Sequence, residues 1–234
     1  MGQIGFLRLM PDEEDKSTMT MIAKLLTNIL GQSWSNVIGG LFGIGRGIIN
    51  RLTNNGIYET LDYESTLELQ NRTGSKAAFS KRKKIRYLQD NIIAYQDYAW
   101  GDGGILRNYR TNLGKPVDRY RSGYKTYILL SLREVKNRGD IDEFKIQWDI
   151  HRGFLTEDGY WSTDVSQRTK HIKIDVIFPK SRPPSRLSLE ENNSRRTQML
   201  ERNAQQQLPD GRWLVSWETN KPRLYEVYVL RWIW

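Results

Sequence analysis

The side chains that most often carry catalysis or metal ions are scarce in this chain. Its 234 residues include no cysteine and only two histidines, His151 and His171. The absence of cysteine excludes disulfides, thiolate metal sites and cysteine nucleophiles. Neither histidine belongs to an H-x-H or H-E-x-x-H spacing, which would place two metal ligands side by side. We therefore expect structural or surface roles for both histidines, and no metal or other cofactor.

Three acids close to a glycine-rich segment could supply carboxylates for acid–base chemistry. Asp97 precedes the W-G-D-G-G run at residues 100–104, Asp102 lies within it, and Asp118 follows it. The run is more typical of a tight turn, because glycine adopts positive φ freely and aspartate bonds to nearby backbone. The G-x-G-x-G run at 43–47 does not follow a strand of a βαβ unit, and no G-x-S-x-G motif is present. The sequence therefore predicts a non-enzymatic protein and indicates no small-molecule substrate.

The basic residues indicate a function more strongly than the acidic residues do. The net charge is +9 and the pI is about 9.6, which favours binding to nucleic acid, anionic lipid or an acidic protein. The candidate anion-binding residues form two clusters: Lys81, Arg82, Lys83, Lys84 and Arg86, and then Arg107, Arg110, Lys115, Arg119, Arg121 and Lys125. The second cluster is interleaved with tyrosines that could stack on bases or lie at a lipid interface. The alternative is an exposed loop with a solvated run of charge.

The first basic cluster also leads to a prediction of where residues 81–84 lie in the fold. In a strand, residues 81–84 would alternate between the two faces of a sheet. Adjacent cations on both faces are unsuited to a core, so we expect an edge strand, a loop or a solvent-facing segment there.

The most unusual element lies before these residues. Residues 25–45 contain no charged side chain, and apolar residues recur at steps of three and four between 22 and 52. This pattern predicts an amphipathic helix over residues 20–53. One side of it carries small and amide side chains, namely Asn28, Gly31, Gln32, Ser35, Gly39, Gly43 and Gly47. Glycine costs a helix about 1 kcal/mol relative to alanine. Small residues spaced by four therefore indicate close approach of another helix.

Several settings for this helix remain open. About 20 uncharged residues are long enough to span a bilayer core, but the amides would need partners or water there. The helix could pack against its copies in a membrane, lie in the membrane interface, bundle in water, or cover the β domain with its apolar face. A largely disordered glycine-rich segment is a further alternative.

The rest of the chain reads as a β domain. An extended acidic segment at 1–19 precedes the helix, and Asn54 to Gly56 mark its end. From residue 57 the period changes to two, which predicts an antiparallel β-sandwich of 8–10 strands over 57–234, with a closed barrel as the alternative.

Details within the β domain can also be predicted. Residues 124–134 and 224–234 read as central or core strands, and 187–189 as a short edge strand. We expect irregular structure at 107–123, a loop or short helix at 190–207, and a hairpin turn at Asp158 and Gly159.

Together these features favour a non-enzymatic protein that associates with itself. Its helix would mediate oligomerisation or membrane insertion, with a pore-forming effector as one form of this hypothesis, and the basic β domain would be cytoplasmic. The localisation that we expect is cytoplasmic, with association at the cytoplasmic face of a membrane as an option. A nucleic-acid-binding β domain and a structural assembly protein are the alternatives.

The helix hypothesis predicts that intact protein releases dye from liposomes and that changing both Gly39 and Gly43 to Leu abolishes the release. The leucine side chains would fill the groove that close helix packing requires. Dye leakage is the measurement, and equal leakage from both proteins would contradict the role given to the glycines.

Overall fold

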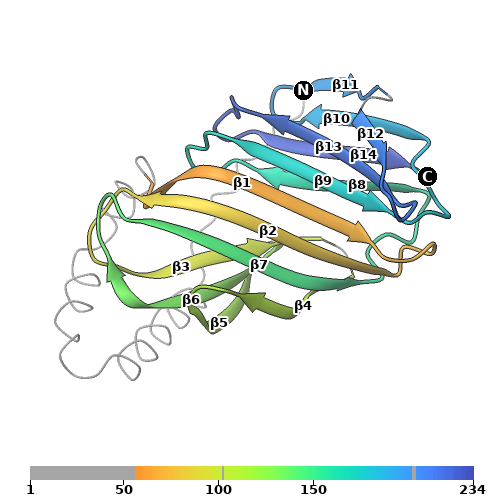
Figure 1. The fold of residues 1–234 in the computed structure, drawn as a ribbon. Helices are drawn as coiled ribbons and strands as arrows, with labels where there is room; N and C mark the ends of the chain where they lie inside the picture. Colours follow the sequence, from red (N-terminus) through yellow and green to blue (C-terminus); the bar gives the residue numbers. More distant parts are fainter. Residues whose placement is uncertain (1–55, 102, 202–203) are drawn as a thin grey trace, which may run out of the picture. The chain divides into compact units, whose positions relative to one another are not determined.

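The computed structural model describes residues 56–101, 103–201 and 204–234. The predicted segments 1–19 and 20–53 lie outside these ranges. Within the ranges the protein is mainly β, with fourteen strands (Figure 1). No helix in them is long and apolar enough to cross a membrane. The prediction of a mainly β domain after residue 57 is confirmed.

The strands follow one another closely along the chain. They are β1 (Tyr58–Leu69), β2 (Lys76–Tyr87), β3 (Ile92–Ala99), β4 (Gly104–Thr111), β5 (Lys115–Ser122), β6 (Lys125–Lys136), β7 (Ile141–His151), β8 (Asp158–Asp164), β9 (Ile172–Phe178), β10 (Arg186–Glu191), β11 (Arg196–Met199), β12 (Gln205–Gln207), β13 (Trp213–Thr219) and β14 (Val227–Ile233). They form a seven-stranded sheet, β12-β13-β9-β1-β2-β7-β4, a four-stranded sheet, β11-β10-β14-β8, and a three-stranded sheet, β3-β6-β5.

Two features of this topology differ from the prediction. The fourteen strands of the described ranges exceed the 8–10 expected, and β1 pairs with β9 in parallel, whereas the other ladders are antiparallel. The physical reason is that side chains alternate with the same period of two in parallel and antiparallel strands. The pattern of one strand therefore does not show whether its neighbour runs parallel or antiparallel to it.

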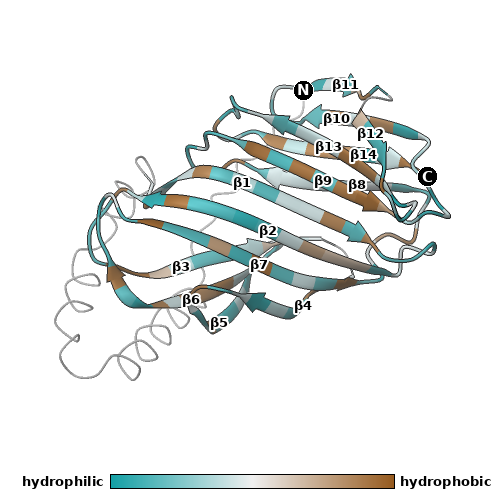
Figure 2. Cartoon of the chain, viewed as in Figure 1, coloured by the Kyte–Doolittle hydropathy of each residue, from teal (hydrophilic) through white to brown (hydrophobic). Residues whose placement is uncertain are grey.

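Alternating side chains give the large sheet one apolar face. In β7, Phe144, Ile146, Trp148 and Ile150 are buried, and the residues between them are polar. Figure 2 shows hydrophobic and hydrophilic residues alternating along the strands of this sheet. The buried face packs against both smaller sheets. Tyr95 of β3 stacks on Phe144 with ring centroids 4.0 Å apart. Phe178 of β9 meets Trp232 of β14 edge-on at 5.3 Å.

The segment 107–123, expected to be irregular, is instead two strands. β4 pairs with β7 and β5 pairs with β6. Both ladders contain register shifts, and Leu106 and Asn108 of β4 have positive φ. Such bulges break the period of two, which explains why the strands were not visible in the sequence. Pro116 is accommodated because β5 is an edge strand.

The C-terminal part also differs in detail. β11 and β12 occupy parts of 190–207, where a loop or helix was expected. β10 lies between β11 and β14, so the edge position predicted for residues 187–189 is wrong. The predicted inner positions of 124–134 and 224–234 are confirmed, because β6 lies between β3 and β5, and β14 lies between β10 and β8.

Asp158 and Gly159 begin β8 rather than forming a hairpin turn. Gly159 is required here by packing, since a Cβ atom on it would lie 2.5 Å from the indole of Trp232. The Trp232 ring is buried and contacts Phe154 and Phe178, so it has little room to move.

We expect Gly159→Ala to destabilise the fold by about 1–3 kcal/mol, because an added methyl group in a filled core forces its neighbours to shift. Urea denaturation followed by circular dichroism measures the change. Gly104→Ala is the matched control, because its Cβ would make an ordinary contact at 3.5 Å with Arg107. Equal stability of the two variants would refute the packing role of Gly159.

Candidate functional site

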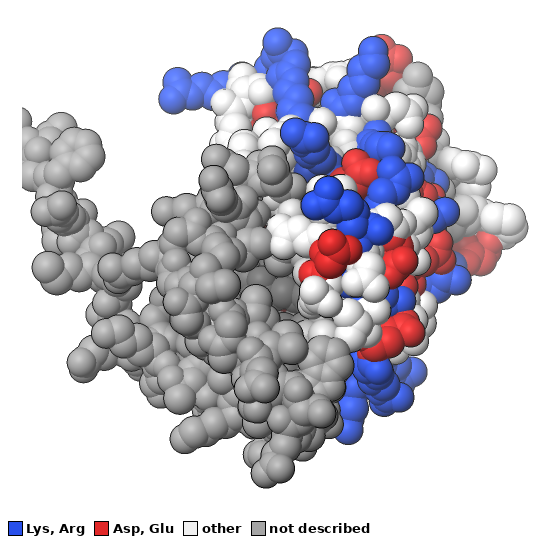
Figure 3. All heavy atoms as spheres, turned by 90° about the vertical axis from the view of Figure 1, so that its left-hand side faces the viewer, with Lys and Arg blue, Asp and Glu red and all other residues white. Residues whose placement is uncertain are grey.

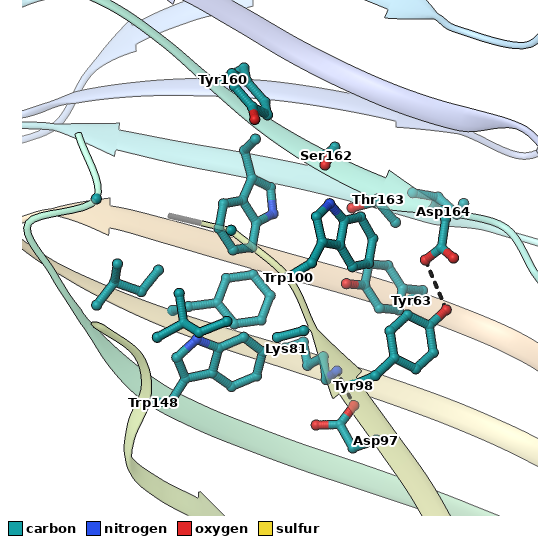
Figure 4. Close-up of a pocket in the computed structure, with 18 of the residues that line it drawn as sticks. Tyr63, Lys81, Asp97, Tyr98, Trp100, Trp148, Tyr160, Ser162, Thr163 and Asp164 are labelled. Atoms are coloured by element: carbon teal, nitrogen blue, oxygen red, sulfur yellow. Dashed lines mark hydrogen bonds and ion pairs between the residues drawn. The ribbon is translucent and has the colours of Figure 1, made fainter. Parts of the chain in front are cut away.

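A pocket of about 240 Å³ lies at the apolar face of the large sheet, bounded by β8 and by the end of β3 (Figure 4). Nine aromatic side chains line it: Tyr63, Phe79, Tyr95, Tyr98, Trp100, Trp148, Phe154, Tyr160 and Trp161. The pocket also contains charged groups, notably Lys81, Lys83 and Asp97. This combination of aromatic walls and a few convergent polar groups is typical of a small-molecule site.

The alternation of β2 places the basic side chains in this pocket. Phe79, Lys81 and Lys83 share one face of the strand, where they line the pocket. β2 lies between β1 and β7 in the middle of the seven-stranded sheet. The expectation of an edge strand or a loop at 81–84 is therefore wrong, and only the face that carries Arg82 and Lys84 is solvent-facing. The physical reason is that a carboxylate from another sheet allows one lysine of the segment to be buried.

That carboxylate belongs to Asp97 of β3. The ammonium of Lys81 forms an ion pair with Asp97 Oδ1, and the two side chains are only 8% and 3% exposed. The hydroxyl of Tyr109 donates to Asp97 Oδ2 at 3.0 Å. Burial acts to lower the pKa of Lys81, but the attraction of Asp97 outweighs it and the pKa lies above its ordinary value of 10.5. The lysine is therefore charged at neutral pH. Figure 4 shows Lys81 reaching Asp97 with Trp148 alongside.

Two indole N–H groups at the pocket have no acceptor. The Nε1 atoms of Trp148 and Trp161 are buried and form no hydrogen bond with the described residues. Their rings lie on the ring of Phe79, with centroid distances of 4.3 Å and 4.6 Å respectively. A buried donor without a partner costs about 1–3 kcal/mol.

A polar contact joins the three-stranded sheet to β8 beside the pocket. Tyr98 of β3 donates to Asp164 Oδ1, and Lys125 of β6 donates to Asp164 Oδ2, each at 2.8 Å. Lys125 also lies over the ring of Tyr98, 4.3 Å from its centroid. These contacts fix Tyr98 and its neighbour Trp100 as one wall of the pocket.

Three tyrosines of the pocket have a raised pKa. Burial raises the pKa of Tyr63, Tyr95 and Tyr98 above its ordinary value of 10.0. At neutral pH their hydroxyls therefore remain protonated, so that each can donate a hydrogen bond.

The first basic cluster is divided between two environments. Lys81 and Lys83 face the pocket, whereas Arg82 bonds Asp62, Glu64 and Glu143 on the opposite face of the sheet. Arg86 pairs with Glu59 at 2.9 Å, and Lys84 is exposed. Acids already compensate much of this cluster, and its binding to an external polyanion stays a prediction.

Most of the second basic cluster lies on two edge strands, whereas Lys125 begins the inner strand β6 and pairs with Asp164. Arg107 and Arg110 of β4, and Arg119 and Arg121 of β5, are exposed and form no ion pair with any described residue. On the face in Figure 3, cationic and acidic side chains are interspersed over the described surface. Nucleic-acid binding through these arginines stays a prediction.

The remaining residues singled out in the sequence are scattered. His171 Nδ1 lies 2.6 Å from Asp62 Oδ1 on the outer face. Burial acts to raise the pKa of Asp62, but hydrogen bonds with His171 and Arg82 outweigh it, so this pKa is lowered. Asp118 accepts a bond from the Arg119 backbone at 2.7 Å, away from Asp97 in the pocket. Among the described residues, no group of three or more acids and histidines could hold a metal ion.

Two sets of predicted positions cannot be located. Asp102 lies outside the described residues, as do the predicted helix residues Asn28, Gly31, Gln32, Ser35, Gly39, Gly43 and Gly47. The helix, its self-association and its contact with a membrane therefore stay predictions.

Comparisons with known proteins add little to this geometry. No family model matches the chain, and no curated protein matches its sequence. Among solved structures, it is similar to an M1 zinc metallopeptidase from Deinococcus radiodurans, with a TM-score of 0.42 and 8% identity, covering 74% of this chain and 42% of that chain. A mutant of an M1 zinc metallopeptidase from this organism bound to a Tyr-Ser-Ala substrate gives 0.44 and 7%, covering 75% and 42%. The chain thus spans less than half of these structures, and TM-scores this low support no argument about function.

We expect Lys81→Met to destabilise the protein by about 3–5 kcal/mol, because it leaves the buried Asp97 carboxylate without its cation. The double variant Lys81→Met with Asp97→Asn should lose less than the sum of the two single changes. Because the pKa of Lys81 is raised, the contribution of the pair is present below pH 10.5 and is lost only as the pH rises through that higher value.

Urea denaturation of the single and double variants at neutral pH measures this coupling. Lys84→Met is the control, because the neighbouring lysine is exposed and should change stability by less than about 0.5 kcal/mol. Strictly additive effects of the two single changes would show that the pair is not coupled.

Proposed function

We propose that residues 56–234 form a non-enzymatic binding domain that holds a small organic molecule in the aromatic pocket. The observation that carries the proposal is a pocket of about 240 Å³ lined by nine aromatic side chains and a few charged groups. Apolar walls with a small number of convergent polar groups are typical of ligand sites. A bound molecule would supply the contacts that the open space lacks.

The walls of the pocket favour a flat, apolar ligand body. The rings of Phe79, Trp148 and Trp161 form a continuous aromatic surface. Aromatic pairs with suitable geometry contribute about 0.5–1.5 kcal/mol beyond the area that they bury. A ring-containing ligand can gain this energy at several walls at once, which supports an aromatic ligand over an aliphatic one.

The polar groups of the pocket favour binding over catalysis. A general base needs a free lone pair aimed at its substrate. Asp97 already accepts from Lys81 and Tyr109, and Asp164 already accepts from Tyr98 and Lys125. Asp97 and Asp164 are therefore engaged in holding the structure together, whereas Asp158, a third carboxylate at the pocket, is exposed at the start of β8.

This proposal is independent of the predictions for other parts of the chain. Self-association or membrane insertion concerns residues 20–53, and nucleic-acid binding concerns the exposed arginines of β4 and β5. A protein that associates through one segment could hold a ligand in its β domain without any contradiction.

The proposal predicts that small aromatic compounds bind and that blocking the pocket prevents it. A screen of one- and two-ring compounds by intrinsic tryptophan fluorescence, with titration calorimetry of the hits, tests the binding. Ser162 lines the pocket, so Ser162→Phe should weaken the affinity of each hit at least tenfold by filling the space. Ser122→Phe, on the exposed part of β5, should leave the affinity unchanged.

Two results would count against the proposal. One is a screen in which no compound binds the folded wild-type protein. The other is a set of hits that bind Ser162→Phe as tightly as they bind the wild type. Circular dichroism spectra of both variants, recorded first, establish that each is folded.

A further inference from the structure

We infer that the pocket takes a short peptide in an extended conformation, whose backbone pairs with the free edge of β8 and whose aromatic side chain lies among Phe79, Trp148 and Trp161. This inference rests on the proposed function and names the class of its ligand. Three properties of the pocket support it, namely the position of β8 along one wall, the lack of features that usually block an edge strand, and the aromatic surface beside Trp161.

The first property is that β8 borders the pocket over its whole length. All seven of its residues line the pocket, although neighbouring side chains in a strand point to opposite faces (Figure 4). What the seven share is the backbone, so the pocket lies along an edge of the strand. In the described residues β8 is the last strand of its sheet, and its other edge pairs with β14 without a register shift.

The hydrogen bonds at both ends of β8 show which of its residues face this free edge. Before the strand, the Trp234 N–H donates to the Glu157 carbonyl at 3.1 Å. After the strand, the Val165 N–H donates to the Glu226 carbonyl at 2.9 Å. Since such pairs recur at every second residue of an antiparallel ladder, the odd-numbered residues of β8 bond to β14. The residues whose backbone groups point away from β14 are Asp158, Tyr160, Ser162 and Asp164.

The backbone groups on this edge are available to a peptide. The Asp158 carbonyl accepts a bond from the Thr156 hydroxyl at 2.7 Å. No described residue bonds to the backbone N–H or C=O of Tyr160 or Ser162. A peptide strand presents donors and acceptors in the same alternation, which is how extended peptides add to exposed sheet edges.

The second property is that β8 lacks the features that usually block an edge. Unpaired backbone groups recruit other strands, so exposed edges commonly carry basic side chains, proline or a bulge. The edge strands β4, β5 and β11 contain arginine, and the ladders of β4 and β5 also contain register shifts. β8 contains no lysine, arginine or proline, and its ladder is regular over seven residues. Its free edge is therefore suited to pairing.

The third property is the aromatic surface on the inner side of the edge. The ring centroid of Trp161 lies 4.6 Å from that of Phe79, which lies 4.3 Å from that of Trp148. Residues opposite each other in paired strands share a face, so a peptide residue opposite Trp161 directs its side chain to these rings. The pocket volume of about 240 Å³ is below the range of about 300–1,000 Å³ for drug-sized ligands, so it suits one large side chain.

A set of capped peptides tests the inference by titration calorimetry. The parent is the acetylated and amidated pentapeptide Thr-Thr-Phe-Thr-Thr. Replacing its Phe by Ala should weaken binding about tenfold, because the ring contacts are lost. In antiparallel pairing the residue opposite Trp161 directs its N–H away from β8, and the residues on either side of it bond to β8. N-methylation of either threonine next to the Phe should therefore weaken binding about tenfold, whereas N-methylation of the Phe should change it little.

Amide hydrogen exchange measured by NMR locates the peptide on the protein. The amides of Tyr160 and Ser162 should exchange readily in the free protein and become protected when the parent peptide binds. Those of Trp161 and Thr163 should be protected in both states, because they bond to β14.

A variant removes one of the donors on this edge. Ser162→Pro eliminates an N–H that faces the pocket and leaves the ladder with β14 intact, since proline is tolerated on an open strand edge. It should weaken the parent peptide about tenfold and still bind the ring compounds found by the screen. Circular dichroism establishes that the variant is folded, and the methylated peptides test the same hydrogen bonds without any change to the protein.

The outcomes separate the two levels of the proposal. If ring compounds bind but the parent peptide does not, or if N-methylation has the same effect at every position, strand pairing is wrong and the binding proposal stands. If neither ring compounds nor peptides bind, both are wrong. Protection of the Tyr160 and Ser162 amides in the free protein would also overturn the inference. It would show that the chain itself already pairs this edge or, where sedimentation gives a dimeric mass, that a second copy does.

Discussion

The ion pair between Lys81 and Asp97 is the constraint on which the interior of this domain depends. It joins a strand in the middle of the large sheet to an edge strand of the three-stranded sheet, across the layer between them. Removing two charges from water costs several kcal/mol per ion, and only good geometry with further hydrogen bonds offsets that cost. The hydroxyl of Tyr109 supplies one such bond. The two sheets must therefore keep a fixed spacing and register here, and this spacing leaves the aromatic side chains around a pocket.

The two faces of the large sheet differ in how their charged side chains are stabilised. On the outer face, Arg82 lies among Asp62, Glu64 and Glu143, where water screens the charges and each pair contributes little. On the inner face, one residue before Arg82, Lys81 has a single carboxylate partner and almost no water. The same stretch of β2 thus stabilises a solvated surface and specifies a buried polar site.

The pocket retains polar groups whose needs the fold does not meet. The indole N–H groups of Trp148 and Trp161 are buried without acceptors, and Lys83 has no carboxylate partner among the described residues. Native interiors satisfy most of their buried polar groups. Thr163 at the pocket, and Ser65 and Trp232 outside its lining, also have buried polar atoms without a partner among the described residues. Burial raises the pKa of Tyr63, Tyr95 and Tyr98 at the pocket.

The amino-acid pattern alone determined that residues 57–234 form a β domain, and it located most strands. The reason is that apolar and polar residues alternate along a half-buried strand. It also divided residues 81–84 between the two faces of a strand and recognised 124–134 and 224–234 as inner strands. It missed β4 and β5 because bulges interrupt that period, and it placed β2 wrongly because burial of a lysine depends on a partner elsewhere. Only the tertiary structure brought Asp97 to Lys81, and β8 to Phe79 and Trp148. Contacts between strands distant in the chain follow from sheet order and layer packing, which no local pattern encodes.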